Sequence, residues 1–194
     1  MKATYKGFQA KKSGGFVDLP PKGSYVAEIK NVVLTEDRNG REILEVMLDI
    51  CEGEYENRYT EVWKDQKERF GDDVKFKGIF RLTPPVEGDE DWRYRTFEGN
   101  LWCVEQSNDK YAWDWDEKKL KGKKVGINIR NRLYTYNGKN RQTTEIGKFE
   151  TVEDVRNGKC KPMKDRDNRE NKEAEESTDG SSFTDVSKEV SVPW

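Results

Sequence analysis

The sequence contains no histidine. Histidine is the commonest general base and the commonest metal ligand in proteins, so its absence argues against most hydrolase mechanisms and against many metal sites. Cysteine is scarce, with Cys51, Cys103 and Cys160 at spacings that form no CxxC pair. We therefore expect buried, reduced thiols and no disulfide framework. A GxxxxGK[ST] loop is also lacking, which argues against nucleotide hydrolysis.

Long apolar runs are missing as well. Hydrophobic residues make up 32% of the 194 residues and charged residues 38%, which is little apolar material for a wholly compact chain. The opening residues, MKATYKGFQAKKSGG, lack the apolar stretch of a signal peptide, and no run reaches membrane-spanning length. The sequence predicts a cytoplasmic protein without a membrane segment, whose folded body has about 100–150 residues.

The net charge of −2 hides an uneven distribution. Residues 165–194 carry nine acidic and four basic side chains, a net charge of −5, which leaves +3 for residues 1–164. The second segment is also poor in apolar residues, the composition of a disordered tail. The sequence thus divides into a basic body and an acidic C-terminal tail.

Alternation of apolar and polar residues predicts a body built mainly of strands. Asn39-Gly40 and Asn137-Gly138 are strong signals for hairpin turns, because both residues of such a turn take positive φ. Residues 55–72 are ambiguous between a strand edge and a short helix. The expected elements are strands at 24–34, 44–50 and 74–82, a helix at 96–107, a helical turn at 114–120, a hairpin of 124–136 with 139–150, and a brief helix at 152–156.

Five strands with a helix between the third and the fourth have the connectivity of an OB-fold, a partly open barrel. A small β-sandwich would have a similar number of strands, and the inserted helix favours the OB-fold. We therefore expect a mostly β protein with a five-stranded OB-fold-like barrel. Its parts would be a flexible arm at residues 1–18, a domain at 19–161 and a disordered acidic tail at 162–194.

The final hairpin carries the clearest candidate binding surface. On its first strand, alternate residues form a basic and aromatic face: Asn128, Arg130, Arg132, Tyr134 and Tyr136. Arginine pairs with phosphate and tyrosine stacks on any base, a combination that suits single-stranded nucleic acid. Lys139 and Arg141 extend the charge past the turn. Lys75, Lys77 and Arg81 of the third strand would join them if the barrel curls that strand alongside.

An ordinary solvated sheet face remains an alternative, since Lys, Arg and Tyr are common there. The tryptophans also have structural explanations. We expect Trp102 to pack on the bottom of the barrel, and Trp113 and Trp115 to anchor the turn before the fourth strand. A metal-dependent nuclease is a further alternative, for which Asp49, Glu52 and Glu54 are the nearest set of carboxylates, although their spacing is not diagnostic.

Several stretches resemble a known family. They are LPPKGSYVAEIKNVVLTEDRNGREILEVMLDICEGEY, FEGNLWCVEQSN, YAWDWDEKKLKGKKVG and the basic, aromatic last hairpin. Together they span most of residues 19–160 and resemble the OB-fold single-stranded DNA-binding proteins of bacteriophages that infect Gram-positive hosts. The resemblance implies a non-enzymatic, sequence-nonspecific binder of single-stranded DNA, without a cofactor, that supports phage DNA replication and recombination in the host cytoplasm.

The C-terminal tip, Val192-Pro193-Trp194, is similar to the tips of bacterial single-stranded DNA-binding proteins, which dock replication and repair enzymes. Only Asp185 and Glu189 are acidic near this tip, and Lys188 lies between them. The sequence leaves two purposes open for the tail: its tip docks replication or recombination proteins, or the tail competes with DNA for the basic face. A protein-interaction module, such as a phage-encoded inhibitor, is the remaining alternative for the whole chain.

Overall fold

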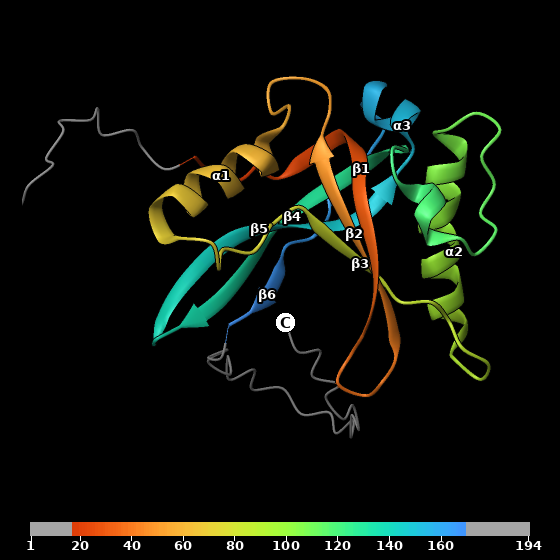
Figure 1. The fold of residues 1–194 in the computed structure, drawn as a ribbon, viewed down its shortest axis with the longest axis horizontal. Helices are drawn as coiled ribbons and strands as arrows, with labels where there is room; N and C mark the ends of the chain where they lie inside the picture. Colours follow the sequence, from red (N-terminus) through yellow and green to blue (C-terminus); the bar gives the residue numbers. More distant parts are fainter. Residues whose placement is uncertain (1–16, 170–194) are drawn as a thin grey trace, which may run out of the picture.

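The structure, a computed structural model, describes residues 17–169, and Figure 1 shows their arrangement. The predicted arm at 1–18 therefore lies outside the described residues except for Val17 and Asp18. The elements are β1 (Gly23–Glu36), β2 (Glu42–Ile50), α1 (Arg58–Phe70), β3 (Ile79–Leu82), α2 (Asp91–Gln106), η1 (Glu117–Leu120), β4 (Lys124–Tyr136), β5 (Lys139–Glu150), α3 (Val152–Arg156) and β6 (Arg166–Asn168).

One sheet contains all the strands, and the fold is mostly β as predicted. The strand order is β3-β2-β1-β4-β5, with antiparallel pairs throughout this path. Within residues 17–169 the end strands β3 and β5 are not joined by backbone pairing, so the barrel is not closed. Instead, the rings of Phe80 and Phe149 lie 4.6 Å apart between their centroids and bridge the gap between these strands.

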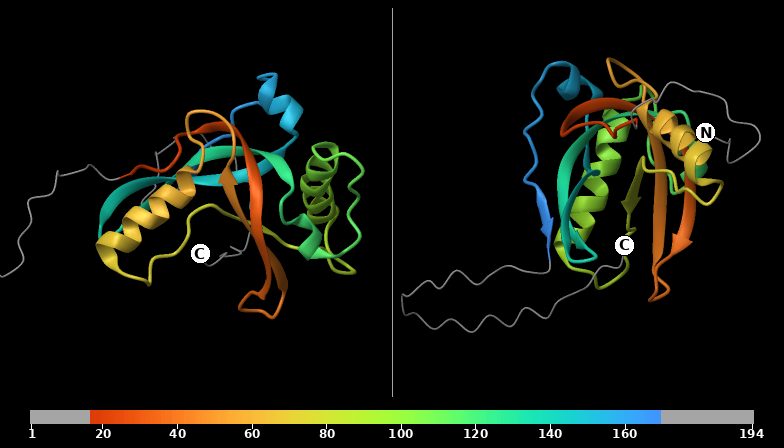
Figure 2. Two further views of the ribbon diagram at one scale, coloured as in Figure 1. Left: turned by 45° about the horizontal axis from the view of Figure 1, so that its top comes forward. Right: turned by 90° about the vertical axis from the view of Figure 1, so that its left-hand side faces the viewer.

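A sixth strand differs from the prediction of five. β4 continues past Ile129, where its pairing with β1 ends, and β6 pairs in parallel with Arg132–Tyr134. Figure 2 shows β6 running beside the β4–β5 hairpin. The sheet therefore includes a strand beyond residue 161, the predicted end of the domain, because the open edge of β4 offers hydrogen bonds to the segment that follows.

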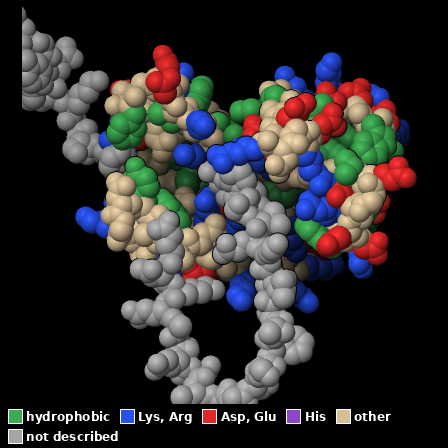
Figure 3. Space-filling view, turned by 90° about the horizontal axis from the view of Figure 1, so that it is seen from below, with side chains coloured by type: hydrophobic (Ala, Val, Ile, Leu, Met, Phe, Trp, Pro, Cys, Tyr) green, Lys and Arg blue, Asp and Glu red, His purple; other side chains and the backbone are tan. Residues whose placement is uncertain are grey.

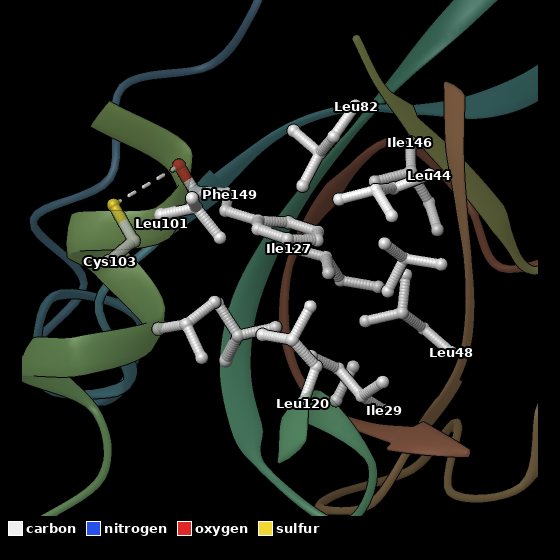
Figure 4. Close-up of a cluster of buried hydrophobic side chains, with 14 of the residues drawn as sticks. Ile29, Leu44, Leu48, Leu82, Leu101, Cys103, Leu120, Ile127, Ile146 and Phe149 are labelled. Atoms are coloured by element: carbon white, nitrogen blue, oxygen red, sulfur yellow. Dashed lines mark hydrogen bonds between the residues drawn. The ribbon is translucent and has the colours of Figure 1, made fainter. Parts of the chain in front are cut away.

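The core lies between the curved sheet, α2 and η1. The alternation predicted for the second strand is confirmed, since Leu44, Val46, Leu48 and Ile50 are all buried. Figure 4 shows side chains of β1, β2, β3, β4 and β5 meeting those of α2 and η1, with the Cys103 thiol directed at the carbonyl oxygen of Phe149. Burial raises the pKa of Cys103 to about 11, which fits the buried, reduced thiol that we expected, whereas Cys51 and Cys160 are only half-buried.

The ambiguous segment 55–72 contains α1, whose first turn is capped from the sheet. Asp49 is completely buried at the end of β2, and its carboxylate accepts hydrogen bonds from the backbone N–H groups of Ile50, Tyr59 and Thr60 at 2.9–3.0 Å. The bonds from Tyr59 and Thr60 satisfy N–H groups that a helix start leaves without partners. Asp49 therefore fixes α1 against β2.

The third strand is shorter than predicted. Residues 74–78 do not extend β3, because they pack on α1. The Trp63 indole donates a hydrogen bond to the Val74 carbonyl at 3.1 Å, and the centre of the Phe76 ring lies 6.3 Å from that of the Tyr59 ring. Lys75 and Lys77 are thus exposed in an irregular segment. The prediction that they lie on a strand with Arg81 is wrong.

Helix α2 lies between β3 and β4, as predicted, but begins at Asp91 and not at Thr96. The prediction for Trp102 is wrong, because 53% of this residue is exposed. The brief helix at 152–156 is confirmed. No helix within residues 17–169 is long and apolar enough to cross a membrane.

Candidate nucleic-acid interface

The β4–β5 hairpin projects from the body, at the left-hand edge of Figure 1. Its turn is the one predicted, since Asn137 and Gly138 both have positive φ, 51° and 69°. Beyond Ile129 the hairpin extends past the end of β1, and β6 lies along its free edge. The candidate interface is therefore the outer face of three strands, β5, β4 and β6.

Alternation along β4 separates this outer face from the core. Val125, Ile127 and Ile129 are completely buried on the inner side, as predicted. Asn128 does not belong to the exposed face, because it is 1% exposed and donates to Glu150 Oε1 at 3.1 Å and to the Lys161 carbonyl at 2.9 Å. The segment after α3 covers it, so the exposed face starts at Arg130.

We use the name Arg-Tyr face for the side chains that the strand register brings together outside the barrel. They are Arg130, Arg132, Tyr134 and Tyr136 of β4, Lys139, Arg141 and Glu145 of β5, and Arg166 of β6. The register places Arg130 opposite Glu145, Tyr134 opposite Arg141 and Tyr136 opposite Lys139. The structure thus brings together six of the nine predicted binding residues.

Glu145 is the carboxylate at the inner end of this face. It accepts hydrogen bonds from Arg130 through a single oxygen, Oε1, at 2.8 Å, and the same oxygen lies 3.8 Å from Arg166. Arg166 is not among the predicted binding residues, because the sequence places it in the acidic tail. Two arginines therefore share one carboxylate, and the inner end of the face keeps a positive balance.

The outer end of the face has cations without carboxylate partners. Among residues 17–169, Arg132, Lys139 and Arg141 form no ion pair. The guanidinium of Arg132 lies 5.9 Å from the centre of the Tyr134 ring, and its Nε atom has no hydrogen-bond partner. Tyr136 is 61% exposed. The arrangement offers positive charge and aromatic rings to a ligand at the same place.

Contacts behind the hairpin hold it to the body. Asp165, just before β6, accepts hydrogen bonds from the backbone and side-chain nitrogens of Asn131 and pairs with Lys22 at 2.6 Å. Lys22, and then Asn131, lower the pKa of Asp165. Met163 packs on Gly147 so closely that an added Cβ would lie 2.5 Å from its sulfur atom. These contacts fix β6 and the hairpin relative to β1.

The three predicted residues of the third strand lie apart from this arrangement. Arg81 is on β3 and pairs with Glu45 of β2 at 2.7 Å, while Lys75 and Lys77 are in the segment that packs on α1. Figure 3, a view from below, shows Lys and Arg side chains towards the middle of the molecule, and Asp and Glu most often at the right-hand end.

Two of the three carboxylates considered for a nuclease have other partners. Asp49 caps α1, and Glu52 pairs with Arg156 at 2.6 Å and with Lys124 at 3.2 Å. These two cations, Arg156 first, lower the pKa of Glu52. Within residues 17–169, no three His, Cys, Asp or Glu side chains are grouped as metal ligands.

The two tryptophans before β4 lie against α2. Trp113 packs on the core, as predicted, with its ring centre 6.5 Å from that of Phe97. Trp115 stacks on the same ring at 5.9 Å but is 66% exposed.

The docking residues predicted at the C-terminal tip, Val192, Pro193 and Trp194, lie outside the described residues.

No protein-family model matches the chain, and no curated protein matches its sequence.

Proposed function

We propose that this protein binds single-stranded DNA through the Arg-Tyr face, without sequence preference and without catalysing a reaction. The observation that carries the proposal is the outer end of the hairpin. There, Arg132, Lys139 and Arg141 have no ion-pair partner within the described chain and lie beside Tyr134 and Tyr136. Cations that are not neutralised internally are available for phosphates.

The spacing of these side chains suits a nucleotide chain. Alternate residues of a strand are separated by about 6.6–7 Å, which is comparable to the reach of one nucleotide. Each base stacked on an aromatic ring contributes about 1–3 kcal/mol, and every base has a face that can stack. Tyrosine rings would therefore hold bases of any sequence while the arginines and the lysine bind the phosphates.

This chemistry favours single strands over duplexes. In a duplex the bases already stack on each other and their faces are closed to a tyrosine, whereas a flexible single strand can turn its bases outward. The phosphates would still attract a duplex to the basic face. The difference in affinity between the two forms therefore reports the stacking contribution.

The order of elements supports an OB-fold as part of the proposal. Strands β1, β2 and β3, helix α2, then β4 and β5 follow one another as in that fold, and β3 lies next to β5 through Phe80 and Phe149. OB-folds bind oligonucleotides through the face of strands 2 and 3 and through the loops after strands 1 and 4. Most of the Arg-Tyr face lies on the two strands that flank the second of these loops, which here is the turn at Asn137-Gly138. Arg81 lies on the face of strands 2 and 3, so we include it at the margin of the proposed site.

The resemblance to single-stranded DNA-binding proteins of phages extends the proposal to a biological role. We infer that the protein protects single strands during phage DNA replication and recombination. That role rests on the resemblance, while the binding itself rests on the arrangement of the hairpin.

Photochemical cross-linking tests the proposed contact. Oligo(dT) in which thymines are replaced by 5-iodouracil cross-links to aromatic side chains that stack on the base. We expect peptides containing Tyr134 or Tyr136 to carry the adduct, and the yield to fall when unlabelled oligo(dT) competes. Adducts confined to the tryptophans near α2 would place the interface elsewhere and contradict the proposal.

A further inference from the structure

Helix α2 has apolar and aromatic residues on two opposite sides. One side is buried against the core through Phe97, Leu101 and Val104. The opposite side carries Trp92 and Trp102, of which 52% and 53% are exposed. A helix at the surface of a globular protein usually presents polar residues outward, so two tryptophans there require an explanation.

Five residues follow the outward side of α2 at helical spacing. They are Trp92, Arg95, Gly99, Trp102 and Gln106, separated by three, four, three and four positions. Residues at this spacing lie on one side of a helix, and we call them the α2 stripe. Figure 1 shows α2 at the edge of the molecule, at the end opposite the tip of the β4–β5 hairpin.

Gly99 is in the middle of the stripe and in the interior of the helix. Glycine lowers the stability of a helix relative to alanine, because it loses more backbone freedom on folding. The fold of the single chain gives no reason for it, since an added Cβ at Gly99 would meet no atom within 4 Å. A second helix crossing at this point would explain it, because a position without a side chain lets two backbones approach closely.

We propose that two copies of this chain associate through the α2 stripe, with the helices antiparallel and crossing at Gly99. The proposal goes beyond DNA binding and does not depend on it. A two-fold axis through Gly99 relates the positions before it on one helix to those after it on the other. Arg95 of each copy then lies near Trp102 of the other.

The stripe is complementary to itself in this arrangement. The side chain of Arg95 is 76% exposed and lies 3.7 Å from an exposed carboxylate of its own helix, Asp91, so it can turn to a partner at little cost. A guanidinium over an indole ring is a favourable cation–π pair, and the two-fold axis forms this pair twice. Tryptophan and arginine are also the residues most enriched at the centres of protein interfaces.

Sedimentation velocity on the full-length chain, without DNA, tests the proposal across micromolar concentrations. We expect a monomer–dimer equilibrium whose dissociation constant rises at least about tenfold in Trp102→Ala, as for the loss of an interface hot spot. Trp115→Ala is the matched control, because Trp115 is 66% exposed but lies outside the stripe. Its dissociation constant should equal that of the wild type.

Gly99→Gln separates association from folding. Glutamine is a better helix former than glycine, so the melting temperature of the monomer should stay the same or rise. Its side chain would keep the two helices apart, so the dimer should be lost. A chain that stays monomeric at every concentration, or a dimer that survives both Trp102→Ala and Gly99→Gln, would overturn the proposal.

Discussion

Tyr134 of β4 lies directly opposite Arg141 of β5 in the register of the last hairpin. Side chains in such opposite positions have Cβ atoms about 4.5–5.5 Å apart, close enough to contact the same nucleotide. Tyr136 and Lys139 repeat the pairing at the next position along the face. The hairpin thus presents two pairs of one aromatic ring and one cation.

The two tyrosines should each contribute to binding of single-stranded DNA. We expect Tyr134→Ala and Tyr136→Ala each to weaken the affinity for oligo(dT) by about 1–3 kcal/mol, the value of one stacked base. Fluorescence anisotropy of a labelled oligonucleotide measures the change. Trp115→Ala removes an aromatic side chain near α2 that is about as exposed as Tyr136, and it should leave the affinity unchanged.

The basic residues of the outer end should set the salt dependence. We expect Lys139→Ala and Arg141→Ala each to reduce the slope of log affinity against log salt concentration by about 0.7, the release expected for one phosphate contact on a single strand. Titrations at several salt concentrations give the slope. Arg156→Ala is the control, because this exposed arginine pairs with Glu52 away from the hairpin. If Arg156→Ala reduced the slope equally, the salt dependence would reflect only the total charge of the protein.

Neutralising the carboxylate of the face should strengthen binding. In Glu145→Gln the amide oxygen can still accept from Arg130, but Arg130 and Arg166 lose their shared negative partner. We expect affinity for oligo(dT) to rise a few-fold at low salt and the gain to shrink as salt screens the charges. Glu153→Gln changes an exposed carboxylate on α3 and should have no such effect. Weaker binding by Glu145→Gln would mean that Glu145 positions Arg130 for the ligand.

Asp49 should matter for stability and not for the binding chemistry. Asp49→Ala leaves three backbone N–H groups without their acceptor, two at the start of α1 and one at the end of β2. We expect the free energy of unfolding in urea to fall by about 2–4 kcal/mol, since the lost bonds are buried and charge-assisted. Asp73→Ala, at an exposed position, is the control. A loss below about 0.5 kcal/mol, the range of ordinary surface substitutions, would contradict this role for Asp49.

The ion pair between Glu52 and Arg156 should make stability depend on pH. Arg156, followed by Lys124, lowers the pKa of Glu52 from the ordinary value of 4.5. A carboxylate with a lowered pKa stabilises the fold above its ordinary pKa, and this contribution is lost as pH falls through the lowered value. Wild type should therefore be more stable than Glu52→Gln at neutral pH, with a difference that shrinks below pH 4.5. Urea unfolding at several pH values would contradict the assignment if the difference stayed constant.

The elements with strict alternation could be predicted from the sequence. β2 and the first part of β4 have apolar residues at every second position, and the strand period of two directly sets which side is buried. The turn at Asn137-Gly138 was predictable for another local reason, because Asn and Gly readily take the positive φ that such a turn requires. The predicted face of Arg130, Arg132, Tyr134 and Tyr136 follows from this alternation alone.

Other features depend on contacts between distant segments. β6 is short and polar, and it forms because β4 has an open edge where β1 ends. Asn128 is buried because the segment around Lys161 covers it. Val74 and Phe76 alternate like a strand but pack on α1. Local sequence does not contain these contacts, so Arg166 was missed and Lys75 and Lys77 were placed wrongly.

The central claim is that the Arg-Tyr face binds single-stranded DNA, and one paired titration tests it most directly. Labelled oligo(dT) and a duplex of equal length are titrated with wild type and with the double variant Tyr134→Ala/Tyr136→Ala, at low and high salt. The account predicts that wild type prefers the single strand, that its affinity falls with salt, and that the double variant loses the preference while remaining folded by circular dichroism. Two results would contradict the claim. The double variant could bind oligo(dT) as tightly as wild type does, or wild type could bind duplex and single strand equally well.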